Sequence, residues 1–188
     1  LNLGGGYGVR YTEEDAAIDI PARLAELAAH LKEETERLGL PMPRFLMEPG
    51  RSIVADAGMT LYTVGSVKRI PGYKQYAAVD GGMTDNPRYA LYQSRYTVYH
   101  AHKSGSMERF DVVGRCCESG DIIQPGVELP GDTCRGDILA VCTTGAYNYS
   151  MASNYNRLPR PAVVMLTPDR IYEAVRRETF ADLTGLDL

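Results

Sequence analysis

The sequence predicts two parts of different fold class. Residues 1–58 read as α/β units of a parallel sheet or barrel, and residues 59–188 as a mostly antiparallel β-barrel or sandwich that ends in a helix. Two observations indicate this division. Apolar side chains recur at three- and four-residue spacing between two strand-like segments that end in glycine turns. After about residue 58, short β-rich runs alternate with Gly, Pro and Asp.

The helix of the first part has clear start and stop signals. Asp19 and Pro21 suit its first turn, where the missing N–H of proline costs little. Gly39 ends the helix, and prolines follow. One buried face is predicted, formed by Leu24, Leu27, Ala28, Leu31, Thr35 and Leu38. Residues 44–48 then predict a short buried strand that ends at Glu48.

The second part is predicted to contain several short strands crowded with tyrosine, which suits half-buried sheet positions. We expect them at residues 61–70, 76–79, 89–99, 109–113, 138–141 and 162–166. A final helix is expected over residues 169–177, after Pro168, with an Asp or Thr as its cap.

Composition excludes several function classes. With 44% apolar residues the chain can bury a substantial core, and its net charge of −4 has both signs interspersed, unlike a nucleic-acid-binding face. No apolar run reaches membrane-spanning length. The four cysteines and three histidines lack the regular spacing of a metal site, so no metal is predicted. Reduced thiols in a cytoplasmic protein are the expectation.

Two glycine turns suggest an anion site. Residues 4–8 (Gly-Gly-Gly-Tyr-Gly) supply backbone N–H groups that a phosphate can approach closely, although such a run is often only a tight turn. Residues 48–51 (Glu-Pro-Gly-Arg) form a second turn at a strand end, with a guanidinium at Arg51. Two such turns at neighbouring strand ends would form one anion cradle.

Three further motifs carry groups suited to chemistry. Arg88 and Tyr92 lie four residues apart and could bind a carboxylate together, or could simply belong to a solvated loop. Cys117 and Glu118 offer a proton donor and a cation-binding group, or else a structural thiol and a surface acid; Cys116 is the better candidate for packing. Tyr147 could direct its phenol at a phosphate or be buried in the core.

As an ordered set, these motifs resemble the pattern of the diaminopimelate decarboxylase family, which are pyridoxal 5'-phosphate (PLP) enzymes of the alanine-racemase-like fold type. The order is GGGxG, EPGR, DGGMxDxxR with LY, CESGD and GAYxxSMASxYN, over essentially the whole chain. The resemblance implies a PLP-binding (β/α)8 barrel that ends near residue 58, a C-terminal β domain over residues 59–188, and a homodimer with shared active sites.

The resemblance also implies roles for named residues. The phosphate of PLP would be held by Gly5, Gly6, Glu48, Gly50, Arg51 and Tyr147. The substrate, meso-2,6-diaminopimelate, would be bound by Arg51, Arg88, Tyr92, Glu118 and Tyr147. Cys117 would be the catalytic proton donor, and Cys117 and Glu118 would serve the active site of the other subunit.

One expected residue is missing. The family forms a Schiff base through a lysine on the first barrel strand, and none of Lys32, Lys68, Lys74 or Lys103 fits that role. We therefore expect this chain to be part of a longer one and to be inactive alone. One alternative is a related PLP decarboxylase of ornithine, arginine or carboxynorspermidine. Of these substrates, ornithine is disfavoured by Glu rather than Asp at position 118. The other alternative is a non-catalytic homologue that binds a partner.

Overall fold

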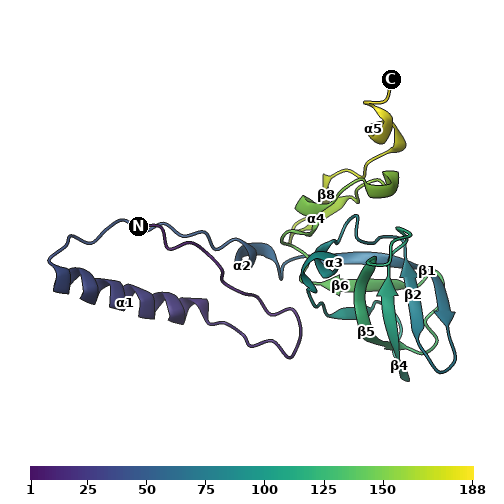
Figure 1. Cartoon of the computed structure of the whole chain (residues 1–188), viewed down its shortest axis with the longest axis horizontal. Helices are drawn as coiled ribbons and strands as arrows, with labels where there is room; N and C mark the ends of the chain where they lie inside the picture. The colour runs from purple at the N-terminus through teal and green to yellow at the C-terminus, as the bar shows by residue number, and fades with distance from the viewer.

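The computed structural model describes residues 1–188 as a six-stranded barrel with a helical segment on one side and an extended arm on the other (Figure 1). The strands are β1 (Met59–Arg69), β2 (Gln75–Val79), β3 (Val98–His100), β4 (Met107–Val113), β5 (Ile122–Pro130), β6 (Ile138–Cys142), β7 (Val163–Leu166) and β8 (Ile171–Val175). The helices are α1 (Ile20–Leu38), α2 (Arg51–Val54), α3 (Arg88–Tyr92), α4 (Asn148–Met151) and α5 (Phe180–Thr184), with a 3₁₀ turn at Tyr155–Arg157. None of the helices is both long enough and apolar enough to cross a membrane.

The barrel sheet has the strand order β3-β6-β1-β2-β4-β5. The first half of β1 pairs with β6 and its second half with β2, with a register shift between Val64 and Ser66. The backbone N–H of Tyr96, just before β3, donates to the Gln124 side chain in β5 at 2.8 Å and draws the two sheet edges together. The barrel is thus nearly closed around buried side chains from every strand, the largest being Phe110, Ile123, Leu129 and Leu139.

The prediction of a mostly antiparallel β domain holds for every pair in the barrel except β2 with β4, which is parallel. A parallel pair needs a long crossover connection. Here the connection between β2 and β4 contains α3 and β3, and it carries Arg88. The sheet is therefore mixed, and the crossover places the predicted substrate loop at one end of the barrel.

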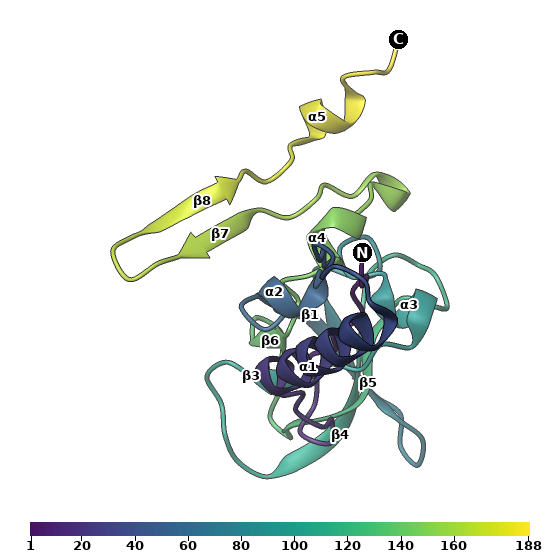
Figure 2. The ribbon, with the colours of Figure 1, turned by 90° about the vertical axis from the view of Figure 1, so that its left-hand side faces the viewer.

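Helix α1 begins and ends where its signals predict. The Asp19 side chain accepts a hydrogen bond from the N–H of Ala22 at 3.0 Å, and Gly39 adopts the left-handed conformation with φ of 65°. The predicted burial is wrong: α1 lies beside the barrel (Figures 1 and 2), no residue in it is buried, and Leu38 is 55% exposed. Periodicity locates a helix, but no other element of this chain covers its apolar stripe.

The predicted buried strand at residues 44–48 is reduced to a single parallel bridge between Asn2 and Leu46. Leu46 is 55% exposed, so the prediction of burial is also wrong there. The parallel direction agrees with the α/β interpretation of this segment.

Two other predictions fail in the β domain. Residues 88–92 form helix α3 instead of the start of a strand, with the N–H of Leu91 donating to the carbonyl of Pro87 at 3.0 Å. The helix predicted at residues 169–177 is strand β8, because Pro168 and Asp169 form a hairpin turn closed by the N–H of Thr167 on the carbonyl of Arg170 at 2.9 Å. The hairpin of β7 and β8 stands away from the barrel (Figure 2), and the final helix is α5, capped by Thr179.

Candidate active site

The two glycine turns lie side by side because the segments before them pair in parallel. The N–H of Leu3 donates to Leu46 at 2.9 Å, and the N–H of Glu48 donates to Gly4 at 2.7 Å. A Cβ on Gly5 would overlap the carbonyl oxygen of Glu48, so only glycine permits this approach. The predicted neighbouring turns are therefore in direct contact.

Backbone donors in these turns are free. The N–H groups of Gly5, Gly6 and Gly50 donate no hydrogen bond within the chain. Gly6, with φ of 89°, faces open space. By contrast, the carboxylate of Glu48 accepts from the Asn2 amide at 2.6 Å. The Glu48 side chain thus binds the segment just before the first glycine turn. The glycines present donors suited to an anion.

Tyr147 lies close to two guanidinium groups. The Cζ atoms of Arg51 and Arg88 lie 5.6 and 5.7 Å from the centre of its ring. The Tyr147 hydroxyl lies beside Gly50, only 2.7 Å from the position that a Cβ of residue 50 would occupy. Tyr147 therefore reaches the second glycine turn. Tyr92 completes the group, with the Arg88 Cζ 5.4 Å from its ring centre. The structure thus brings together four of the predicted site residues beside the glycine turns.

Arg88 is buried without a counter-ion. It is 5% exposed, and its Nε donates to the Tyr96 hydroxyl at 3.1 Å while Nη2 donates to Ser94 Oγ at 3.3 Å. Burial raises the pKa of the Tyr96 phenol although the charge of Arg88 opposes that rise, so Tyr96 stays neutral and can accept this bond. Neither Arg88 nor Arg51 forms an ion pair with any carboxylate of the chain, and the Nε of Arg51 is buried without a partner. A buried guanidinium without a counter-ion, such as that of Arg88, favours an anionic ligand.

Four contributors to this cluster were not found from the sequence. Tyr11 packs edge-to-face on Tyr96 with ring centres 5.5 Å apart, and the Arg51 guanidinium lies over its ring. Ser94 and Tyr96 bind Arg88, and Asn148 is 4% exposed with both amide atoms unpartnered. Of these four residues, only Asn148 could have been found from the sequence, because it is adjacent to Tyr147. Ser94 and Tyr96 are placed by the turn after α3, and Tyr11 lies in a loop far away in sequence.

Cys117 and Glu118 lie elsewhere. They line an open pocket of about 370 Å³ together with Lys74, Tyr76 and Asp111. No hydrogen bond or ion pair connects them to Arg51, Arg88, Tyr92 or Tyr147 within this chain. Cys117 is exposed, with φ of 53°, whereas Cys116 is buried and its thiol pKa is raised by burial and by the neighbouring Asp121 charge. The expectation that Cys116 packs is confirmed, and the Cys117 pocket is separate from the arginine cluster.

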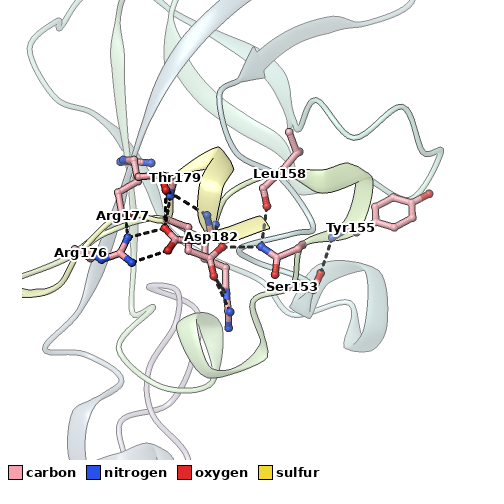
Figure 3. A network of polar contacts seen from close by, with 10 residues as sticks. Ser153, Tyr155, Leu158, Arg176, Arg177, Thr179 and Asp182 are labelled. Atoms are coloured by element: carbon pink, nitrogen blue, oxygen red, sulfur yellow. Dashed lines mark hydrogen bonds and ion pairs between the residues drawn. The ribbon is translucent and has the colours of Figure 1, made fainter. Parts of the chain in front are cut away.

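Polar contacts tie the last predicted motif to the C-terminal arm (Figure 3). The Asn154 amide donates to the carbonyl of Leu158 at 3.1 Å and to Glu178 at 2.6 Å. Arg160 donates to the same carboxylate at 2.7 Å and lowers the pKa of Glu178 to about 2. Farther along, Arg176 pairs with Asp182. This network fixes the path of residues 153–158.

Comparison with known proteins places the chain. Residues 17–145 match the family described as pyridoxal-dependent decarboxylase, C-terminal sheet domain. The chain belongs to this family. Among its curated relatives, the diaminopimelate decarboxylase of Bacillus subtilis is 50% identical over 190 residues, covering the whole chain and 43% of the relative. That of Synechocystis is 44% identical over 189 residues, covering the whole chain and 40% of the relative.

Solved structures of this decarboxylase family agree. The diaminopimelate decarboxylase of M. jannaschii in complex with L-lysine superposes with a TM-score of 0.89 at 33% identity, over all of this chain and 42% of that one. The lysine/ornithine decarboxylase of Vibrio vulnificus with cadaverine has a TM-score of 0.71 at 25% identity, over 83% of this chain and 40% of that one. The chain spans less than half the length of the relatives it matches.

Proposed function

We propose that this chain acts as the C-terminal part of a PLP-dependent decarboxylase that converts meso-2,6-diaminopimelate to L-lysine and CO2. The observation that carries the proposal is the cluster of Tyr147, Arg51 and Arg88 beside two glycine turns with free N–H groups. The names of the relatives support the same reaction.

The glycine turns fit the phosphate of the cofactor. Free N–H groups of Gly5, Gly6 and Gly50 would donate to it, the Arg51 guanidinium would balance its charge, and the Tyr147 hydroxyl would reach it. When bound, PLP withdraws electrons from the substrate α-carbon as the carboxyl group leaves. The contribution of this chain is to hold the phosphate and so to fix the cofactor's position.

Arg88 would bind the distal carboxylate of the substrate. Its buried guanidinium is oriented by Tyr96 and Ser94, which engage Nε and Nη2 and leave Nη1 for a ligand. The exposed Tyr92 lies against the same guanidinium and would add a phenol donor. Glu118 would pair with the distal ammonium, and Cys117 would donate the proton that replaces the lost carboxyl group.

Two copies of the chain are needed in this scheme. Cys117 and Glu118 have no contact with the arginine cluster of their own chain, so we propose that they complete the site of a second subunit in a homodimer. We also propose that residues 1–58 are the end of the (β/α)8 barrel and that residues 59–188 are the β domain. The four free thiols suit a cytoplasmic enzyme.

The charges of the site favour diaminopimelate over ornithine. A distal amino-acid centre carries both charges, which Arg88 and Glu118 match, whereas ornithine has no distal carboxylate. A decarboxylase acting on ornithine, arginine or carboxynorspermidine is the alternative, and the similarity to a lysine/ornithine decarboxylase supports it more weakly. A non-catalytic homologue that binds a partner is the other alternative. The intact Cys117–Glu118 pair and the complete anion cradle argue against it, because a pure binding module has no need of them.

The proposal is tested by reading the coding sequence upstream of Leu1 and assaying the isolated chain. We expect about two hundred further residues that contain a strand-borne lysine, the remainder of a typical barrel. The isolated chain, supplied with PLP, should release no CO2 from meso-2,6-diaminopimelate. A start codon directly before Leu1, or turnover by the isolated chain, would contradict the proposal.

A further inference from the structure

We propose that Asp121 is a positioning residue that holds the Cys117 loop in its working conformation. The Asp121 carboxylate binds the N–H groups of Met83 and Cys116, and the Asn156 amide binds the carbonyl of Cys116. We call these groups together the Asp121 latch. The inference rests on the proposed function, because it assigns to Asp121 a role in the reaction through Cys117. Asp121 itself is not placed in contact with substrate or cofactor.

The carboxylate of Asp121 joins two loops. It is 5% exposed, and its two oxygens accept from the N–H of Met83 and the N–H of Cys116, each at 2.6 Å. Hydrogen bonds from backbone N–H groups to an ionised carboxylate are about twice as strong as neutral ones. The loop before Arg88 and the loop of Cys117 are therefore bound to one buried charge.

Two glycines make room for this carboxylate. A Cβ on Gly82 would lie 2.5 Å from Asp121 Oδ1, and a Cβ on Gly114 would overlap both oxygens. Neither glycine has a positive φ, so backbone conformation does not require glycine at these positions. Glycine is required because the backbone at both positions comes so close to the Asp121 carboxylate that a Cβ would not fit.

Asn156 binds the carbonyl of the same residue, Cys116. Its Nδ2 donates to the carbonyl of Cys116 at 2.5 Å. The N–H and the C=O of Cys116 are thus both bound, immediately before Cys117, whose φ of 53° is uncommon for a residue with a Cβ. An uncommon backbone conformation persists only where its surroundings hold it. The two bonds fix the direction in which the Cys117 thiol leaves the loop.

The segment that carries Asn156 is itself anchored. The N–H of Ser153 donates to the carbonyl of Thr84 at 2.8 Å, and Asn154 is bound to Leu158 and Glu178 (Figure 3). Three segments, around residues 83, 116 and 156, therefore meet at one point. The position of the proton donor depends on all three.

The test is a double-mutant cycle in the completed enzyme, in which this chain is joined to the upstream part of its own coding sequence. Asp121→Asn keeps the shape but turns an amide NH₂ toward an N–H donor. We expect it to lower kcat by about 10- to 100-fold, the cost of a misplaced catalytic group, with KM little changed. Combined with Cys117→Ala it should cause no further loss, because both changes act on the same proton transfer. Additive losses would overturn the proposal.

Amide hydrogen exchange gives a second readout that does not depend on turnover. In Asp121→Asn the N–H groups of Met83 and Cys116 should exchange about tenfold faster or more, while Asp169→Asn, at an exposed position of the β7–β8 turn, should leave both unchanged. If Asp121→Asn does not fold, Asn156→Gly keeps the positive φ of residue 156 and removes the bond to Cys116, and it replaces Asp121→Asn in the cycle. Unchanged exchange of the Met83 and Cys116 N–H groups in folded Asp121→Asn would also overturn the proposal. A wild-type enzyme without decarboxylase activity would refute the proposed function instead, and the exchange rates would still decide whether the latch exists.

Discussion

Replacing Cys117 by alanine in the completed enzyme is expected to lower kcat by about 10²- to 10⁴-fold, the usual contribution of a positioned general acid. The affinity for PLP should stay close to that of the wild type, because the phosphate cradle that we propose consists of residues 4–8, residues 48–51 and Tyr147 and does not include Cys117. Cys117 is exposed in its own chain and fills no core position, so its loss should not lower stability. Steady-state CO2 release and PLP titration by absorbance measure the two quantities separately.

Cys134→Ala is the matched control for this prediction. Cys134 is also an exposed thiol, but it lies in the turn between β5 and β6, away from the predicted site. Its removal should leave kcat unchanged. A Cys117→Ala enzyme that lost turnover and cofactor binding to the same degree would show that the thiol is structural.

Replacing Arg88 by glutamine should lower kcat/KM for meso-2,6-diaminopimelate by about 30-fold or more, since truncating one partner of a buried, hydrogen-bonded charge pair costs about 2–5 kcal/mol. Glutamine retains a donor for the Tyr96 hydroxyl, so the fold should tolerate the change better than it would tolerate alanine. Most of the loss should appear in KM, because the distal carboxylate is bound in the ground state and the transition state alike.

Arg95→Gln controls for the loss of a positive charge in the same loop. Arg95 pairs with Glu14 at 2.8 Å, and its side chain is 58% exposed, so its ion pair is a surface one of small effect. Equal kinetic losses in the two variants, or no loss in Arg88→Gln, would show that Arg88 does not bind the substrate. Thermal unfolding of both variants separates a binding defect from a folding defect.

Elements with local signals were predictable from the sequence. The cap at Asp19 and the glycine at position 39 fixed both ends of α1, and β-branched runs located β1, β2, β4 and β6. Strand β5 was missed because Pro125 and Gly126 interrupt it, where β4 and β5 shift register. In the C-terminal hairpin β7 was predicted at residues 162–166, whereas β8 was missed because Pro168 and Asp169 suit both helix starts and turns.

In the candidate site, the residues in sequence motifs were predictable and the residues that orient them were not. Motif order identified Arg51, Arg88, Tyr92 and Tyr147, which the structure brings together. The residues that orient them could not be predicted, because a partner such as Tyr96 is selected by the path of the chain after α3. The burial expected for the apolar stripe on α1 was wrong because no other element of this chain covers the stripe.

The central claim is that this chain supplies the cofactor cradle and substrate site of a diaminopimelate decarboxylase. The most direct measurement is CO2 release by a chimera that carries the upstream part of the Bacillus subtilis diaminopimelate decarboxylase followed by this chain in place of its matched region. We expect turnover of meso-2,6-diaminopimelate. The kcat/KM for ornithine should be at least about tenfold lower, because ornithine has no distal carboxylate. A folded, PLP-loaded chimera that released no CO2 from meso-2,6-diaminopimelate, or preferred ornithine, would contradict the account.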